Sequence, residues 1–153
     1  MTRIRYAAAA MVLLGALGLS RLAHADPCQL EISANDQMQY DKQTLTVPAS
    51  CQEVTLTLHH VGKLPREAMG HNWVLVNAAD FNAVADAGTA AGLANDYVAP
   101  GDKRVLAHTK IIGGGQTTSI TFPTSILKPG ADYRYLCTFP GHNALMRGTL
   151  RFG

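Results

Sequence analysis

The sequence predicts an all-β fold, an eight-stranded antiparallel β-sandwich of Greek-key type with one short helical flap. Three observations point to this class. Apolar and polar residues alternate in short segments along most of the chain, turn-forming residues separate these segments, and one stretch alone loses the alternation. Neither an internal repeat nor a second domain is evident, so we expect one domain over residues 26–153.

The first 25 residues have the features of a secretory signal peptide. Arg3 and Arg5 give a positive start, and residues 7–19 form an unbroken apolar run. Ala23-His24-Ala25 then fits the small residues of a cleavage site. Because the apolar run is shorter than the about 20 residues of a membrane span, we expect cleavage after Ala25 and no membrane attachment of the mature domain.

Eight segments carry the strand pattern. In residues 53–59, Val54, Leu56 and Leu58 share one face and are expected to be buried. Asn35-Asp36 and similar turn-forming residues separate the segments. The predicted strands, in chain order, are residues 29–33, 44–47, 53–59, 73–77, 104–111, 117–122, 133–137 and 148–152.

Residues 78–93 predict the helical flap. This stretch is rich in alanine and lacks the β-branched alternation of the segments around it. Gly88 and Gly92 weaken a helix here, because glycine is a poor helix former. We therefore expect a short helix between the fourth and fifth predicted strands.

The charge of the mature chain argues against nucleic acid as a partner. Loss of residues 1–25 lowers Lys+Arg from 13 to 10, while Asp+Glu stays at 11. Nucleic-acid-binding domains carry a basic surface, which a net charge of about −1 does not supply. We expect no nucleic-acid partner.

Three cysteines in an exported protein leave one without an internal disulfide partner. Cys28 and Cys51 each lie beside a predicted strand, and an oxidising compartment would let them pair. On the chain-entropy model such a bond stabilises the fold by about 3 kcal/mol. Cys137 is then the free thiol, and it is either an inert core residue or a functional one.

The free cysteine belongs to a loop rich in metal-binding side chains. Cys137, His142 and Met146 offer a thiolate, an imidazole and a thioether within ten residues. Thiolate and thioether favour copper among the first-row metals, and two histidines, a cysteine and a weak axial methionine are the ligands of blue-copper electron-transfer sites. The loop predicts such a site if a second histidine joins it.

The second histidine is one of His59, His60, His71 and His108. His59 and His60 are neighbours on a strand and face opposite sides, so at most one of them could reach the site. His71 begins an apolar strand after Gly70, whose lack of a Cβ would let its carbonyl approach a metal. With every coordination position filled by protein, electron transfer is favoured over catalysis.

Two other classes of function stay open. Cys137 and His142 could be the nucleophile and base of a hydrolase, but that chemistry needs an activated thiol and gives Met146 no role. A storage or delivery protein for copper or zinc could use the same histidine and cysteine ligands. Such proteins need exchangeable sites, whereas apolar residues surround this loop.

Four stretches carry a resemblance to a known family. They are residues 35–39 (NDQMQ), 69–75 (MGHNWVL), 104–110 (RVLAHTK) and 137–142 (CTFPGH). With the leader and the spacing of the first two cysteines, they resemble the azurins, which are bacterial periplasmic cupredoxins, across nearly all of residues 26–153. The resemblance implies a cupredoxin-like sandwich and a periplasmic, monomeric copper protein that carries electrons and is not an enzyme.

The resemblance also implies roles for individual residues. The implied ligands of one copper ion are His71, Cys137 and His142 in a plane, Met146 as axial ligand and the Gly70 carbonyl as a weak ligand. Asn72 and the backbone amide of Phe139 would hydrogen-bond around the ligand loop and the cysteine sulfur. His60 would be a partly buried, pH-responsive residue near the copper.

A partner-docking surface follows from the same resemblance. It would surround a solvent-facing edge of His142. Its implied members, called here the apolar patch, are Met38, Leu64, Met69, Phe139, Pro140, Ala144 and Leu145. Azurins exchange electrons with c-type cytochromes, copper nitrite reductase and amine dehydrogenases, so such redox proteins are the expected partners. Tyr40, where many relatives have Phe, and Thr89, where Met is frequent, depart from the family pattern.

Overall fold

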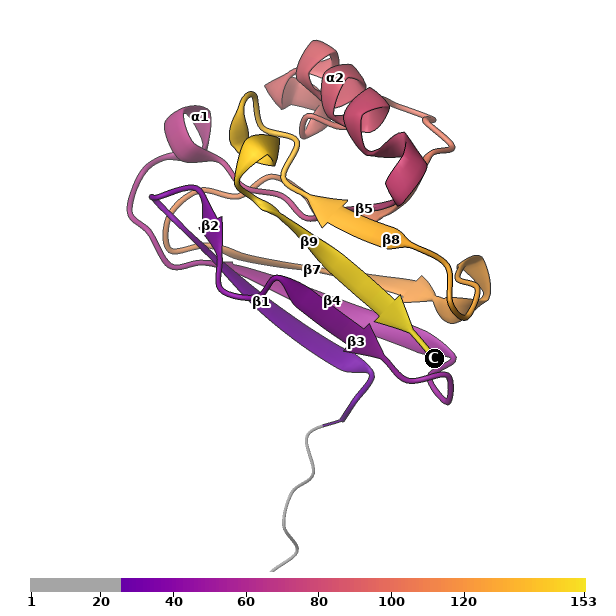
Figure 1. The fold of residues 1–153 in the computed structure, drawn as a ribbon. Helices are drawn as coiled ribbons and strands as arrows, with labels where there is room; N and C mark the ends of the chain where they lie inside the picture. Colours follow the sequence, from indigo (N-terminus) through magenta and orange to yellow (C-terminus); the bar gives the residue numbers. More distant parts are fainter. Residues whose placement is uncertain (1–25) are drawn as a thin grey trace, which may run out of the picture.

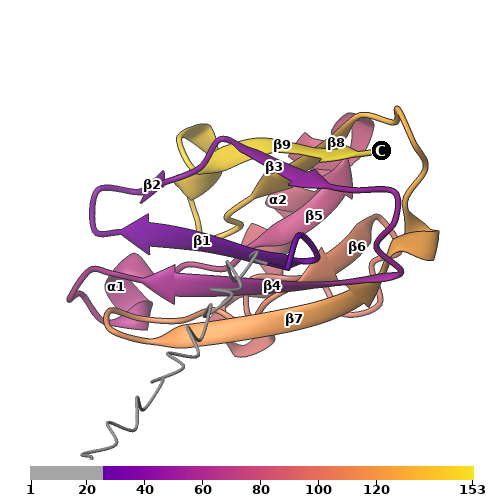
Figure 2. The same cartoon turned by 90° about the horizontal axis from the view of Figure 1, so that it is seen from below.

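The alternating segments of the sequence form two β-sheets that pack face to face (Figures 1 and 2). A computed structural model describes residues 26–153. The predicted signal peptide, residues 1–25, lies outside the described residues. Within the described part, no helix has the length and apolar character needed to cross a membrane.

One sheet has four strands in the order β2-β1-β4-β7, and the other has five in the order β3-β9-β8-β5-β6. The strands are β1 (Gln29–Asn35), β2 (Gln39–Tyr40), β3 (Thr44–Val47), β4 (Glu53–His60), β5 (Val74–Asn77), β6 (Val105–His108), β7 (Thr117–Pro123), β8 (Tyr133–Leu136) and β9 (Arg147–Phe152). The helices are α1 (Arg66–Met69) and α2 (Phe81–Ala91), with short 3-10 turns η1 (Ala78–Asp80), η2 (Leu93–Asn95), η3 (Thr124–Ile126) and η4 (His142–Ala144).

All eight predicted strands are present, and the predicted sandwich with one helical flap is confirmed. The two-residue strand β2 is an addition to them. The expectation of purely antiparallel pairing is wrong, because β1 pairs with β4, and β3 with β9, in parallel. The alternation of a strand reports which of its faces is buried and carries no information about the direction of its neighbour.

Strand β4 shows how the pattern positions a histidine. Val54, Leu56 and Leu58 are fully buried between the sheets, and the same face of the strand continues to His60. His59 faces the other side and contacts Thr117 of β7 through its ring. Of the two neighbouring histidines, therefore, only His60 enters the interior at the end of the strand.

The centre of the core is Trp73, which is fully buried directly before β5. Its ring centroid lies 5.8 Å from that of Tyr135 and 6.1 Å from that of Phe122. At one end of the sandwich, a disulfide between Cys28 and Cys51 ties the start of β1 to the segment before β4, which confirms the predicted pair.

Helix α2 covers part of the outer face of the five-stranded sheet (Figure 1). Its Val84 and Ala85 pack in a second apolar cluster with Val74, Val76 and Leu136 of the sheet. Gly88 and Gly92 of the flap are each needed for a different structural reason. A Cβ on residue 88 would collide with the carbonyl of residue 97, and residue 92 ends the helix with a φ of 74°.

Candidate metal centre

Three potential metal ligands converge at the end of the sandwich opposite the disulfide. His71 lies between α1 and β5, Cys137 directly follows β8, and His142 begins the turn η4. The loop of residues 137–146 turns back at Gly141, which adopts a φ of 81°. A hydrogen bond from Cys137 N to Met146 O, 3.0 Å long, joins its two ends. The loop thereby closes on itself within ten residues.

The ligand atoms have the spacing of a small metal site. Cys137 Sγ lies 4.0 Å from His71 Nδ1 and 3.7 Å from His142 Nδ1, and all three atoms lie within 4.8 Å of one another. With metal–sulfur and metal–nitrogen distances of about 2.3 and 2.0–2.1 Å, a trigonal arrangement separates sulfur from nitrogen by about 3.8 Å. The donor set therefore fits a metal ion in the plane of these atoms.

Each imidazole is oriented by contacts outside the cluster. His71 Nε2 donates to the Asn35 carbonyl at 2.8 Å, which leaves the lone pair of Nδ1 directed to the cluster. Two backbone hydrogen bonds with Ile112 fix the His71 main chain. The His142 ring lies 4.4 Å from that of Phe139 and 5.1 Å from that of His71, measured between centroids.

Burial decides the protonation of the three groups. It lowers the pKa of both His71 and His142 to about 4, so both imidazoles are neutral at pH 7. Burial also raises the pKa of the Cys137 thiol to about 11, while the backbone amides of Asn72 and Phe139 act in the opposite direction. A bound cation would have to displace the thiol proton, as metal ions do at cysteine sites.

Asn72 connects three segments beneath the cluster. Its Nδ2 donates to Asp96 O at 2.7 Å and to Thr138 Oγ1 at 2.8 Å, and its Oδ1 accepts from Thr138 N at 3.0 Å. Asp96 in turn accepts from Ile111 N at 3.0 Å through its carboxylate. These bonds fix the segment that carries His71, directly before β5, relative to the cysteine loop, residues 137–146.

Gly70 and Met146 are the two remaining ligands that the resemblance implies. The Gly70 carbonyl oxygen is 3.9 Å from Cys137 Sγ, and a Cβ on this residue would collide with the Arg66 carbonyl and the Ile111 side chain. Met146 is fully buried, and its N donates to His142 O at 2.8 Å. Their roles as weak ligands stay predictions.

His60 is part of the same end of the molecule. Its ring stacks on that of His71 with centroids 4.4 Å apart. Its Nδ1 accepts from Gly62 N at 3.1 Å, and its Nε2 lies 2.9 Å from Met69 O, so both ring nitrogens have a hydrogen-bond partner. The predicted pH response of His60 stays a prediction.

The residues of the predicted apolar patch are partly or fully exposed. Leu145 and Leu64 are 62% and 42% exposed. His142 itself is only 3% exposed, so any partner would reach it through its edge. The use of this surface for docking stays a prediction.

Sequence reasoning missed three contributors. Asp96 and Thr138 bond Asn72 across the fold, and the Tyr40 hydroxyl donates to the Asn72 carbonyl beside His71. The sequence marks Tyr40 as a departure from the family pattern but does not predict its contact with Asn72. These pairings join residues at least 24 positions apart, and no local pattern marks them.

A β-sandwich that brings two neutral imidazoles and a buried thiol together defines a cupredoxin-type protein. The family model of copper-binding proteins, the plastocyanin/azurin family, matches residues 26–153. The chain therefore belongs to the plastocyanin/azurin family of copper-binding proteins, and copper is its cofactor.

Relatives within this family include several azurins, which confirms the resemblance seen in the sequence. The azurin of Bordetella pertussis is 54% identical over 127 residues, 83% of this chain and 85% of the relative. That of Pseudomonas aeruginosa is 51% identical over 142 residues, 93% and 95% of the two chains. The solved azurin Az-iso2 of Methylomonas sp. strain J is 47% identical, with a TM-score of 0.80 over 82% of this chain and 98% of that one.

Proposed function

We propose that the protein is a periplasmic electron carrier that binds one copper ion through His71, Cys137 and His142. Met146 would be the axial ligand and the Gly70 carbonyl a weak one. The bound ion would supply a one-electron Cu(I)/Cu(II) couple. The observation that carries this proposal is the convergence of one thiol and two imidazole nitrogens within 4.8 Å of one another at a buried position.

The surrounding residues are suited to holding a site unchanged between two oxidation states. Asn72 ties the segment that carries His71 to the cysteine loop with two hydrogen bonds to Thr138, and a third bond joins it to Asp96. The Asn35 carbonyl fixes the His71 ring. Amides directed to the Cys137 sulfur favour its thiolate form. A ligand set that does not rearrange lets an electron enter or leave without a large movement of protein.

The two alternative functions fit these observations less well. A nucleophilic cysteine needs a lowered pKa and access for a substrate, whereas Cys137 is fully buried with a raised pKa. A delivery protein must exchange its metal readily, whereas all three candidate ligands are buried. Electron transfer is the function that needs neither access nor exchange.

Periplasmic location and the identity of the partners belong to the same proposal. The signal-like residues 1–25 and the disulfide between Cys28 and Cys51 both suit an oxidising compartment outside the cytoplasm. The partners would be c-type cytochromes, copper nitrite reductase or amine dehydrogenases, and the apolar patch would be their docking surface. The carrier would act as a monomer.

The visible spectrum of the mature protein tests the proposal. We expect an intense thiolate-to-copper band after addition of Cu(II), lost on reduction with ascorbate and regained on reoxidation. Cys137→Ser should abolish the band, whereas His59→Gln, which removes an imidazole outside the cluster, should leave it intact. A pale adduct in the unmodified protein, or a band that survives Cys137→Ser, would show that this thiol is not a ligand.

A further inference from the structure

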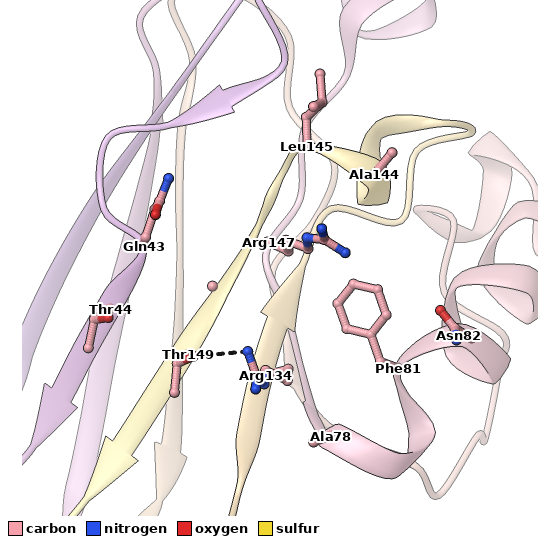
Figure 3. A pocket seen from close by; sticks show the side chains of 11 residues that line it. Gln43, Thr44, Ala78, Phe81, Asn82, Arg134, Ala144, Leu145, Arg147 and Thr149 are labelled. Atoms are coloured by element: carbon pink, nitrogen blue, oxygen red, sulfur yellow. Dashed lines mark hydrogen bonds between the residues drawn. The ribbon is translucent and has the colours of Figure 1, made fainter.

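An open groove on the outer face of the five-stranded sheet begins at the apolar patch (Figure 3). It has a volume of about 850 Å³ and lies between β3 on one side and the start of α2 on the other. Ala144 and Leu145, two members of the apolar patch, line one end of it. The groove therefore continues the surface at which a redox partner would approach His142.

Two arginines give the groove a positive character. Arg134 of β8 and Arg147 of β9 line it, and none of its lining residues is acidic (Figure 3). Arg134 lies opposite Thr149, two residues from Arg147 on the same face of β9. Diagonal neighbours of this kind start about 7–8 Å apart on the sheet, so both arginine side chains rise into the same groove.

The two arginines differ in how their charge is compensated. Arg134 Nε pairs with Asp132 at 3.2 Å, and its Nη1 donates to Thr149 Oγ1 at 3.3 Å. Within residues 26–153, Arg147 has no carboxylate within ion-pair distance. The uncompensated charge of the groove is therefore that of Arg147, which directly adjoins Leu145 of the apolar patch.

A second, smaller depression of about 360 Å³ meets the groove at the same side chain. The two share Gln43, Leu145 and Arg147 among their lining residues. Arg147 therefore lies where both hollows meet, with the amide of Gln43 as a neutral hydrogen-bonding group nearby. An acidic side chain inserted here would find a fork of guanidinium donors and an amide without meeting a negative charge.

We propose that Arg147 and this groove recognise a carboxylate on an acidic redox partner while the apolar patch covers His142. The partner is a redox protein that presents an aspartate or glutamate beside an apolar electron-transfer surface. The inference rests on the proposed function and adds the chemistry of the partner. Apolar contact brings two redox centres close but does not fix how the partner is oriented. A charge pair at the edge of the contact does fix that orientation.

The overall charge of the protein makes this local charge important. With 10 basic and 11 acidic residues after residue 25, the molecule as a whole does not attract an acidic protein. Attraction has to come from a group close to the contact, within the about 10 Å over which charges act at 0.1 M salt. Arg147 meets this condition because it adjoins the apolar patch in both sequence and space.

Stopped-flow electron transfer from the reduced copper protein tests the inference. The probes are two single-haem c-type cytochromes, one with acidic and one with basic residues around the exposed haem edge. With the acidic probe at low salt we expect Arg147→Gln to lower the second-order rate constant about three-fold and Arg147→Glu about ten-fold. Both effects should disappear near 1 M salt, where the screening length is about 3 Å.

Controls separate docking from the copper site itself. Any change of copper potential alters both probe reactions in the same direction, so the ratio of the two rate constants reports charge recognition. Arg151→Gln removes the same charge from the same face of β9, four residues away and outside the groove, and should leave the ratio unchanged. Arg134→Gln should have a smaller effect than Arg147→Gln, because its charge is already paired.

The possible outcomes are distinct. A ratio that falls with Arg147 variants and not with Arg151→Gln supports the inference. Equal ratios for all variants, with copper-dependent transfer intact, overturn the groove and leave the proposed function standing. Absence of a copper band or of any transfer in the unmodified protein overturns the proposed function, and the inference with it.

Discussion

The two ends of the sandwich are stabilised in different ways. At one end, the Cys28–Cys51 disulfide joins strands whose inward side chains are apolar. At the other end, a group of polar side chains is buried and bonds across the fold; its members are His60, His71, Asn72, Cys137 and His142. Burial of a polar or charged group costs free energy unless the group has a partner. The stability of the end that holds the candidate ligands, called here the metal end, therefore depends on protonation and on a bound ion.

Acid should expose this difference most strongly. The folded-state pKa of His71 and of His142 is about 4, against 6.5 for an unperturbed imidazole. Between these values the unfolded chain binds more protons, so stability present above pH 6.5 is lost as the pH falls toward 4. From pH 7 to pH 5 we expect the metal-free protein to lose about 2 kcal/mol per imidazole.

Urea unfolding of the metal-free protein at both pH values measures this loss. The copper-loaded protein should lose less, since the bound ion competes with the protons. His142→Gln should remove about half of this pH dependence of the free energy of unfolding. His59→Gln should leave the contribution of the two buried imidazoles unchanged. An identical pH dependence in the His142→Gln protein would contradict the assignment.

Removal of the disulfide should affect the opposite end alone. Cys28→Ser combined with Cys51→Ser should lower the free energy of unfolding by about 3 kcal/mol, because the unfolded chain gains conformational freedom. The copper spectrum of the folded variant should be unchanged, since Cys51 lies just before β4, whereas His60 at the other end of this strand stacks on His71 of the cluster. Denaturant unfolding and a visible spectrum check the two expectations, and a shifted copper band would show that the ends are coupled.

Asn72→Ala should lower the free energy of unfolding by about 2 kcal/mol, because it leaves the buried Thr138 amide without its acceptor. Copper should also leave the variant faster, as the cysteine loop loses its tie to the segment that carries His71. Loss of the copper band to a chelator measures this rate. Asn77→Ala is the matched control, since Asn77 is exposed and donates one long hydrogen bond of 3.4 Å to Asp80. Equal chelation rates for the two variants would count against the role of Asn72.

Tyr40→Phe should have the smallest effect, a loss of about 1 kcal/mol from the hydrogen bond to the Asn72 carbonyl. Tyr135→Phe removes a comparable bond to the Lys42 carbonyl, 2.6 Å long, and serves as the control. Both should lose similar stability, but only Tyr40→Phe should shift the copper potential, because Asn72 directly follows His71. Cyclic voltammetry compares them, and equal shifts would refute a specific role of Tyr40.

Local patterns were sufficient to predict every strand except the two-residue β2. Alternation in residues 53–59 correctly identified the buried face of β4, and alanine enrichment located the region of α2. The same patterns could not give strand direction, so the parallel pairs of β1 with β4 and β3 with β9 were missed. Direction depends on how connections cross between the two sheets, and no single segment contains that information.

For the metal centre, the sequence by itself determined the loop that carries Cys137, His142 and Met146, because all three lie within ten residues. It left four histidines as candidates for the second imidazole; the position of His71 at the start of a strand after Gly70 favoured it, and the resemblance to azurins selected it. The tertiary structure decided that His71 reaches the cluster while His60 stacks behind it, that Asn72 bonds Thr138 and Asp96, and that Arg147 borders the apolar patch. The physical reason is that ligand chemistry belongs to side chains, whereas their convergence depends on the packing of strands distant in sequence.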